Sequence, residues 1–268
     1  MYSKPRDLLY PEDARRVRDA LIDGLEYDAA FAILGERLSR LSPDCVLPTT
    51  MVVTRFGALD VENTVRKELA GLCARLAVIS MISRFDRASQ ALLLQRRFLE
   101  GLLRIGFQKM PGPELLKIRR KTQGEIRSHS PVQVVVGLLV TGPSPALRAR
   151  AMWLADIYRV RNCLAHREGI VQMEDAGDAD ELRVKWLKMK AIINRTELTS
   201  IPRKVDAPIT LEMRFDESWR TWRIGQPVHL SAADCQDIAF SLAVLESRVL
   251  AEFEVEMNSL LRDHRPPQ

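Results

Sequence analysis

The chain has 268 residues, of which 46% are hydrophobic and 28% are charged, and its net charge is +5. This apolar content is ordinary for a globular protein and argues against disorder throughout. The four cysteines lie far apart and form no C-x-x-C pair, which argues against a zinc site and a dense disulfide framework. We therefore expect reduced, buried thiols, with no metal ion and no cofactor.

The chain also lacks the patterns of an exported or membrane protein. Its N-terminus has no apolar signal core, and the apolar run Val132–Thr141 is too short to span a bilayer. We expect a cytoplasmic protein that does not contact a membrane.

Helical patterns dominate the first two thirds of the chain. Pro11 and two acids predict a helix start, and apolar residues at helical spacing continue to about Arg40. Asp60–Gln108 contains no proline but is long for one helix, so we expect two helices with a break near Arg84–Ala88. Gly169 is the expected C-cap of a later helix. Further helices are predicted at residues 114–126, 131–139, 144–167 and from a capping box at Ser231 onward.

A change in periodicity predicts strands before the last helix. Leu182–Trp186 and Ile209–Asp216 alternate between apolar and polar residues, as half-buried strands do. We expect a turn at Asp216–Ser218 and a third strand at Trp219–Ile224. The prediction is a mainly α-helical bundle with a small antiparallel β-sheet inserted at about residues 181–230. Residues 1–57 are predicted to form an N-terminal helical extension to a bundle of residues 58–268.

Positive charge gathers in the window Gln95–Arg127. This window holds nine basic residues and three acids, so its surplus exceeds the net charge of the whole chain. A clustered positive field favours a polyanion such as RNA or DNA, with Arg119, Arg120 and Lys121 as candidate contacts. The same pattern is also typical of a solvated helix face, and the sequence leaves both readings open.

The helix predicted at residues 144–167 carries an arginine in its apolar stripe. Four apolar residues form this stripe, and Arg161 takes the slot four residues after the third of them. A buried arginine must find a carboxylate, a partner chain or an anionic ligand. Tyr158, Asn162 and His166 follow at spacings of four on an adjacent face. The four apolar residues are Leu147, Leu154, Ile157 and Leu164.

These polar groups suit phosphodiester chemistry without a metal. A histidine can accept or donate a proton near neutral pH, a guanidinium can stabilise charge on a phosphate, and Asn162 could orient either group. RNA already supplies the nucleophile as its 2′-hydroxyl. The structural alternative is that Arg161 pairs with Asp156 or a glutamate and that His166 merely caps the helix.

The stretch Tyr158–Arg167 resembles the signature of HEPN-domain proteins, in which an arginine, a polar residue and then a histidine lie on a late helix of a bundle. Arg161, Asn162 and His166 match these positions. The resemblance implies a homodimer in which the Arg and His of two protomers meet and cleave RNA without metal. It also implies a toxin–antitoxin, anti-phage or RNA-processing role, with an antitoxin protein as a possible partner. Some members of the family have lost catalysis.

The function predicted from the sequence is a metal-independent endoribonuclease of the HEPN type, with Arg161, Asn162, His166 and Tyr158 as its site residues. The alternative is a non-catalytic HEPN-like protein that binds a partner protein or nucleic acid. A DNA-binding regulator has less support, because no clear helix-turn-helix is present. The tryptophans of the strands could stack on bases, but we expect them in the core: Trp186, Trp219 and Trp222.

Overall fold

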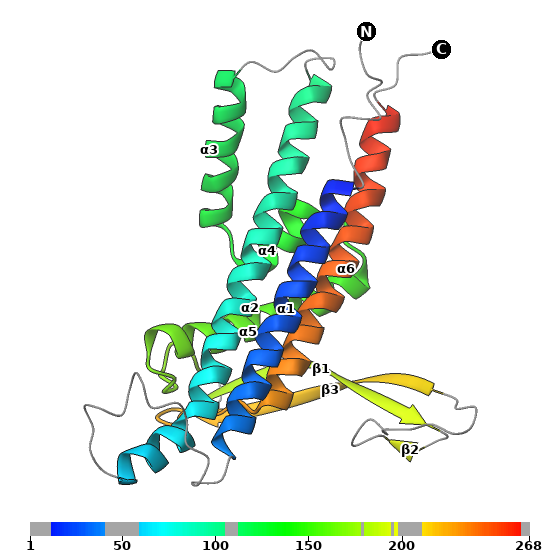
Figure 1. Cartoon of the computed structure of the whole chain (residues 1–268). Coiled ribbons are helices and arrows are strands. Elements are labelled where there is room, and N and C mark those ends of the chain that lie inside the picture. The colour runs from blue at the N-terminus through cyan, green and yellow to red at the C-terminus, as the bar shows by residue number, and fades with distance from the viewer. Residues whose placement is uncertain are drawn as a thin grey trace. The chain divides into compact units, whose positions relative to one another are not determined.

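The protein is mainly α-helical and carries a small antiparallel sheet, as predicted (Figure 1). The computed structural model describes residues 12–40, 59–104, 112–177, 180–193, 196–197 and 211–263. The chain forms two compact units. Unit 1 comprises residues 1–28, 79–158 and 242–268, and unit 2 comprises residues 29–78 and 159–241. The division predicted at residue 57 stays a prediction.

Four long helices each contribute residues to both units. The helical elements are α1 (Glu12–Ser39), α2 (Leu59–Arg104), α3 (Gly112–Ser128), α4 (Pro131–Gln133), the π-helix η3 (Val134–Leu139), α5 (Pro145–His166) and α6 (Ala232–Asp263). The strands are β1 (Glu181–Ile193), β2 (Thr196–Glu197) and β3 (Leu211–Arg223). No helix of the described ranges is both long and apolar enough to cross a membrane. The predicted extension of α2 to Gln108 lies outside the described residues.

Helix α2 is continuous, so the break predicted near Arg84–Ala88 is wrong. The polar side chains that interrupt its apolar stripe have partners within unit 1. The Arg84 guanidinium donates from Nε to Asp28 Oδ2 at 2.8 Å, and the carboxylate of Asp86 accepts a hydrogen bond from the Tyr158 hydroxyl. Because these charges are paired, the helix accommodates them without a break.

A glycine on α1 makes room for the ion pair between Arg84 and Asp28. A Cβ built on Gly24 would lie 2.7 Å from Cδ of Arg84, closer than side chains approach. Asp28 follows one turn later and is buried. The bare backbone at Gly24 therefore lets the arginine cross α1 to reach its carboxylate.

Arg96 is the main buried charge of unit 1. Its side chain is 6% exposed, and it donates to Glu100 at 2.8 Å, to the carbonyl of Leu139 at 2.7 Å and to Glu256 at 2.9 Å. Glu256 also accepts from the backbone N–H of Thr141 at 3.0 Å. This network joins α2, η3 and α6, and it satisfies a guanidinium that would otherwise be costly to bury.

The sheet of unit 2 is built on a long hairpin. β1 and β3 pair antiparallel without interruption from Glu181↔Arg223 to Ile193↔Leu211, and they run side by side in Figure 1. The turn predicted at Asp216–Ser218 is therefore wrong, because Asp216 pairs with Lys188 within the ladder. The two strands predicted around that turn are one strand, and the third strand is the short β2.

The two faces of the hairpin differ in burial. Trp186 and Trp222 are buried, as expected for core residues, whereas Trp219 is 42% exposed and Phe215 is 55% exposed. The guanidinium of Arg183 lies over the Trp219 ring, 4.0 Å from its centroid, in a cation–π contact. The expectation that Trp219 belongs to the core is therefore wrong, and Phe215 is more exposed than the inner face of a half-buried strand would be.

The described cysteines are free and buried thiols, as predicted: Cys73, Cys163 and Cys235. Burial raises the pKa of Cys163 to about 11 and that of Cys235 to about 12. Both side chains therefore stay protonated near neutral pH and are poor nucleophiles. Cys45 lies outside the described residues.

One carboxyl group is buried without a partner. Glu246 on α6 is fully buried, and neither of its carboxylate oxygens has a hydrogen-bond partner among the described residues. Burial disfavours the charged form and raises the pKa of Glu246 to about 7. The folded protein therefore holds this proton at pH values where the unfolded chain has released it.

We expect Glu246→Gln to change how stability depends on pH. In the wild type, the free energy of unfolding should fall as pH rises from about 4.5 to about 7 and then level off. The variant lacks this titration, so at pH 8 it should exceed the wild type by about 3 kcal/mol, with the gap closing toward pH 4.5. Urea denaturation across this pH range measures the difference.

Glu252 on the same helix provides the matched control. Although burial favours its protonated form, hydrogen bonds from Ser144 hold the pKa of Glu252 below its ordinary value. Glu252→Gln should therefore lower the free energy of unfolding at pH 8. Parallel pH profiles for Glu246→Gln and the wild type would contradict the assignment of Glu246.

Candidate functional site

The end of α5 has the pattern predicted from the sequence. The four apolar residues of its stripe are all buried, and Arg161, in the slot between Ile157 and Leu164, is half-buried. Asn162 and His166 are exposed. The four buried residues are Leu147, Leu154, Ile157 and Leu164.

Arg161 is hydrogen-bonded to the other two motif residues. Its Nη1 donates to Asn162 Oδ1 at 3.0 Å and lies 3.3 Å from His166 Nε2. A guanidinium has no acceptor, so Nε2 must accept this hydrogen bond, and the neutral imidazole then carries its proton on Nδ1. The contact thus presents His166 in the form that can receive a proton at Nε2.

The positive charge of Arg161 is not matched by an acid in the part of the chain that the structure describes. No carboxylate among the described residues pairs with it, and its Nε is buried without a hydrogen-bond partner. This differs from the structural alternative, in which an acid neutralises the arginine. Neutral groups set the position of the guanidinium and leave its charge uncompensated, which is the state expected of an anion-binding arginine.

Two left-handed residues, Glu168 with φ +56° and then Gly169, follow the end of the helix. Gly169 has φ +81°, and its N–H donates to the carbonyl of Cys163 at 3.1 Å, so the predicted C-cap is confirmed. The N–H of Val228 donates to Gly169 at 2.7 Å, and that of Val171 donates to Gln226 at 3.0 Å. The chain after α5 is thereby tied to the segment that follows β3, within unit 2.

A buried carboxylate fixes the turn that follows. Asp175 is 1% exposed and accepts from Arg167 Nη1 at 2.5 Å and from the N–H of Gln172 at 3.1 Å. Sequence reasoning missed this role because Asp175 lies in a stretch that looks like an ordinary polar loop. The available signal was Arg167, a second arginine next to His166 that also needs a partner.

Tyr158, the fourth predicted site residue, belongs to unit 1. Its hydroxyl donates to the carboxylate of Asp86 in that unit. Hydrogen bonds therefore join Arg161 to Asn162 and to His166, while a role for Tyr158 in the site stays a prediction.

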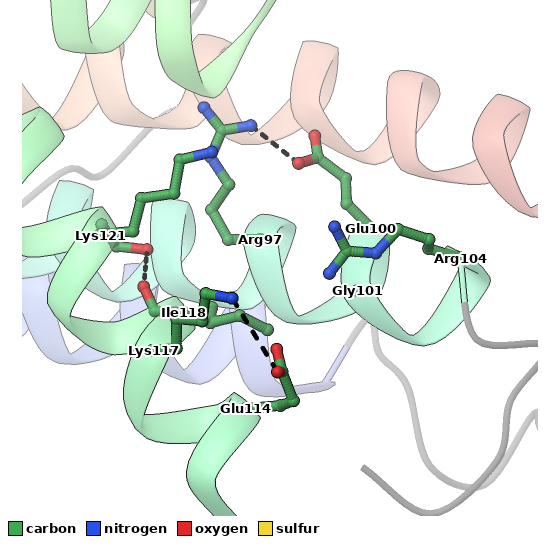
Figure 2. Close-up of a pocket in the computed structure, with 9 residues that line it drawn as sticks. Arg97, Glu100, Gly101, Arg104, Glu114, Lys117, Ile118 and Lys121 are labelled. Carbon is green, nitrogen blue, oxygen red and sulfur yellow. Dashed lines mark hydrogen bonds and ion pairs between the residues drawn. The ribbon is translucent and has the colours of Figure 1, made fainter. Parts of the chain in front are cut away.

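The basic window of the sequence separates into groups with different surroundings. Arg96 is buried in its network, whereas Arg119 and Arg120 are exposed and have no partner among the described residues. Lys109 lies outside the described residues. Four basic residues line a pocket of about 330 Å³ between α2 and α3 in unit 1: Arg97, Arg104, Lys117 and Lys121 (Figure 2).

Of the three predicted nucleic-acid contacts, only Lys121 lines this pocket. The pocket itself was not predicted, because its two walls come from separate helices whose pairing a linear pattern does not reveal. The signal that could have found it is the recurrence of charged residues at spacings of three and four on both helices.

The described part of the chain contains no group of three or more His, Cys, Asp or Glu residues able to hold a metal ion. Comparison of the chain with family models, with curated proteins and with solved structures found no match.

We expect Arg161→Met to leave the fold stable, because the arginine makes no ion pair with a described residue. Its free energy of unfolding should stay within about 0.5 kcal/mol of the wild type. Arg96→Met is the matched control: it strands two carboxylates and a carbonyl and should cost about 3 kcal/mol. Chemical denaturation compares the two variants. An equal loss in both would show that Arg161 serves the fold instead.

Proposed function

We propose that the protein is a metal-independent endoribonuclease of the HEPN type that acts through Arg161 and His166. The observation that carries the proposal is a guanidinium held by Asn162 and His166 with no acid of the described ranges to neutralise it. Such a group gains favourable interactions when a phosphate arrives, and this gain is available to stabilise a transition state. The resemblance of Arg161, Asn162 and His166 to the HEPN motif adds support.

The geometry suggests a sequence of events at the phosphodiester. An incoming phosphate draws the Arg161 guanidinium away from His166 and frees the lone pair of Nε2. The 2′-hydroxyl of the RNA then attacks the adjacent phosphorus while its proton passes to Nε2. Arg161 stabilises the extra charge on the phosphate oxygens. The bond from phosphorus to the 5′-oxygen breaks, and that oxygen takes up a proton from a second histidine in its protonated form, leaving a 2′,3′-cyclic phosphate and a 5′-hydroxyl.

The proposed site is completed by a second copy of the chain. The leaving oxygen needs a proton donor, and a single His166 that has just accepted a proton serves less well than a pair of histidines. A two-fold contact between the ends of two α5 helices would supply one His166 as the base and the other as the proton donor, because such an interface presents the same residues from each side. The resemblance implies this same arrangement.

The resemblance also implies a toxin or anti-phage defence role, and with it an antitoxin protein as partner. Three exposed basic side chains of α3 are candidates for RNA affinity outside the motif: Arg119, Arg120 and Lys121. These residues would contact phosphates of the backbone without reading sequence.

A non-catalytic HEPN-like binding protein is the second candidate. The observation that favours it is the partly exposed aromatic surface of β3, where Phe215 is 55% exposed and Trp219 is 42% exposed. Exposed aromatic residues are common at protein interfaces. In this case, loss of His166 would leave partner binding unchanged.

We expect the protein to cleave RNA in EDTA and to leave DNA intact. The products should carry 2′,3′-cyclic phosphate and 5′-hydroxyl ends, and a single 2′-deoxy substitution should block cleavage at that position, because the nucleophile is missing. His166→Ala and Arg161→Ala should each lower the rate by at least about 100-fold. Gel analysis of end-labelled oligoribonucleotides measures both effects.

The control is His129→Ala, which removes another exposed histidine at the end of a helix and should leave the rate unchanged. Activity that vanishes in EDTA and returns with magnesium would overturn the mechanism. A wild type that is inert on all RNA substrates, together with normal folding of both variants, would favour the binding protein.

We also expect a homodimer whose contact does not require catalysis. His166→Ala should leave the dimer intact, since proton transfer is lost but packing is not, and Arg161→Ala should keep or tighten it by removing repulsion between like charges. Sedimentation velocity at micromolar concentration measures the state, and the specific activity should fall when dilution dissociates the dimer. A monomer that cleaves RNA at the full rate would rule out a composite site.

A further inference from the structure

The pocket of unit 1 is built from one face of each of two helices. α2 contributes Arg97, Glu100, Gly101 and Arg104, and α3 contributes Glu114, Lys117, Ile118, Lys121 and Thr122. Both sets recur at spacings of three and four, which is the repeat of residues that share one helix face. The volume of about 330 Å³ lies at the lower end of the range for small-molecule sites, about 300 to 1,000 Å³.

Arg97 forms a fixed wall of this pocket. It donates to Glu100 at 2.7 Å and to Glu125 at 3.1 Å. Although burial opposes the charge, these carboxylates raise the pKa of Arg97 above its ordinary value. Its position and its charge are therefore set before any ligand binds.

The other three cations are available to a ligand. Arg104 has no partner among the described residues, and Figure 2 shows its guanidinium pointing toward the space between α2 and α3. Lys117 and Lys121 make only long contacts, 4.0 Å to Glu114 and 3.9 Å to Glu125, with side chains that are 78% and 74% exposed. Exposed pairs of this kind contribute little and exchange readily for a stronger anion.

We propose that this pocket binds the terminal phosphate of a nucleotide, either free or at the end of an RNA strand. Four cations and two carboxylates line it, so it keeps a positive surplus in a concave site, where the field is concentrated. A terminal phosphate carries close to two negative charges at neutral pH, whereas an internal phosphodiester carries one. Three movable donors within one pocket match the phosphate with the higher charge and more free oxygens.

The carboxylate of Glu114 contacts Lys117, one of the cations that would bind the phosphate of the ligand. This carboxylate faces Lys117 in Figure 2, within the same pocket. A phosphate that enters must compete with this carboxylate for the ammonium group. Removal of the charge on Glu114 should therefore strengthen phosphate binding.

The test uses the full chain with His166→Ala in every sample, so that any cleavage of RNA is suppressed. Fluorescence anisotropy compares one oligoribonucleotide with a 5′-phosphate and with a 5′-hydroxyl, and calorimetry compares AMP with adenosine. We expect the phosphorylated member of at least one pair to bind about tenfold more tightly. If only the oligonucleotide pair shows the preference, the ligand is the phosphorylated end of an RNA strand. If AMP binds more tightly than adenosine, the pocket accepts a free nucleotide.

The variants separate the pocket from the general positive charge of α3. Arg104→Gln and Lys117→Gln should each remove most of the preference for the phosphorylated ligand, and Glu114→Gln should increase it about threefold. Arg119→Gln removes the same charge from the same helix outside the pocket and should leave the preference unchanged. Equal binding within both pairs, or an equal loss in Arg119→Gln and Arg104→Gln, would overturn the proposal.

This site does not depend on the proposed ribonuclease activity. The readout is a preference between two ligands that differ by one phosphate, measured in a variant without the proposed base. If the protein fails to cleave RNA but prefers the phosphorylated ligand, the phosphate-binding proposal stands and the ribonuclease proposal fails. If it cleaves RNA without this preference, the phosphate-binding proposal fails and the ribonuclease proposal stands.

Discussion

The pairing of buried charge governs unit 1. Arg96 lies inside the packed helices and is accommodated because two carboxylates and a carbonyl from three elements surround it. Arg84 crosses α1 to Asp28 for the same reason, through the gap at Gly24. A guanidinium reaches further than an aliphatic side chain, so each pair joins helices that apolar contacts alone would align less specifically. The long helices can therefore carry charges on their inner faces without breaking.

Arg161 differs from these arginines because no described carboxylate pairs with it. Two helix arginines have different surroundings: the buried Arg96 is neutralised by carboxylates, while the half-buried Arg161 is held by an amide and an imidazole. These neutral partners orient the guanidinium of Arg161 without neutralising its charge. The pocket between α2 and α3 combines both conditions, since Arg97 is anchored by acids and Arg104 is not. Both proposed sites, the Arg161 motif and the pocket between α2 and α3, contain an arginine that no described carboxylate neutralises.

Local patterns predict most elements, but they do not predict long-range partners. The stripe of α5, the Gly169 cap and the register of apolar and polar residues in β1 follow from spacing alone. The continuity of α2 does not, because the partners of Arg84 and Asp86 lie 56 and 72 residues away in sequence. Asp216 resembles a turn residue until Lys188 is placed opposite it. Arg161, Asn162 and His166 could be chosen because one helix turn joins them, whereas the pocket required two helices to be brought together.

The hairpin leaves one long strand at the edge of the sheet. Among the described strands the order is β2-β1-β3, so β3 has a row of backbone N–H and C=O groups without a neighbouring strand. Such an edge can recruit another chain into a growing sheet, and exposed Phe215 increases the risk. Charged residues interrupt β3 from Glu212 to Arg223, and like charges oppose the stacking of identical strands. The polar stretch Asp216–Ser218, which makes β3 look like two strands in the sequence, thus places two acidic residues on this edge strand and opposes aggregation of the folded chain.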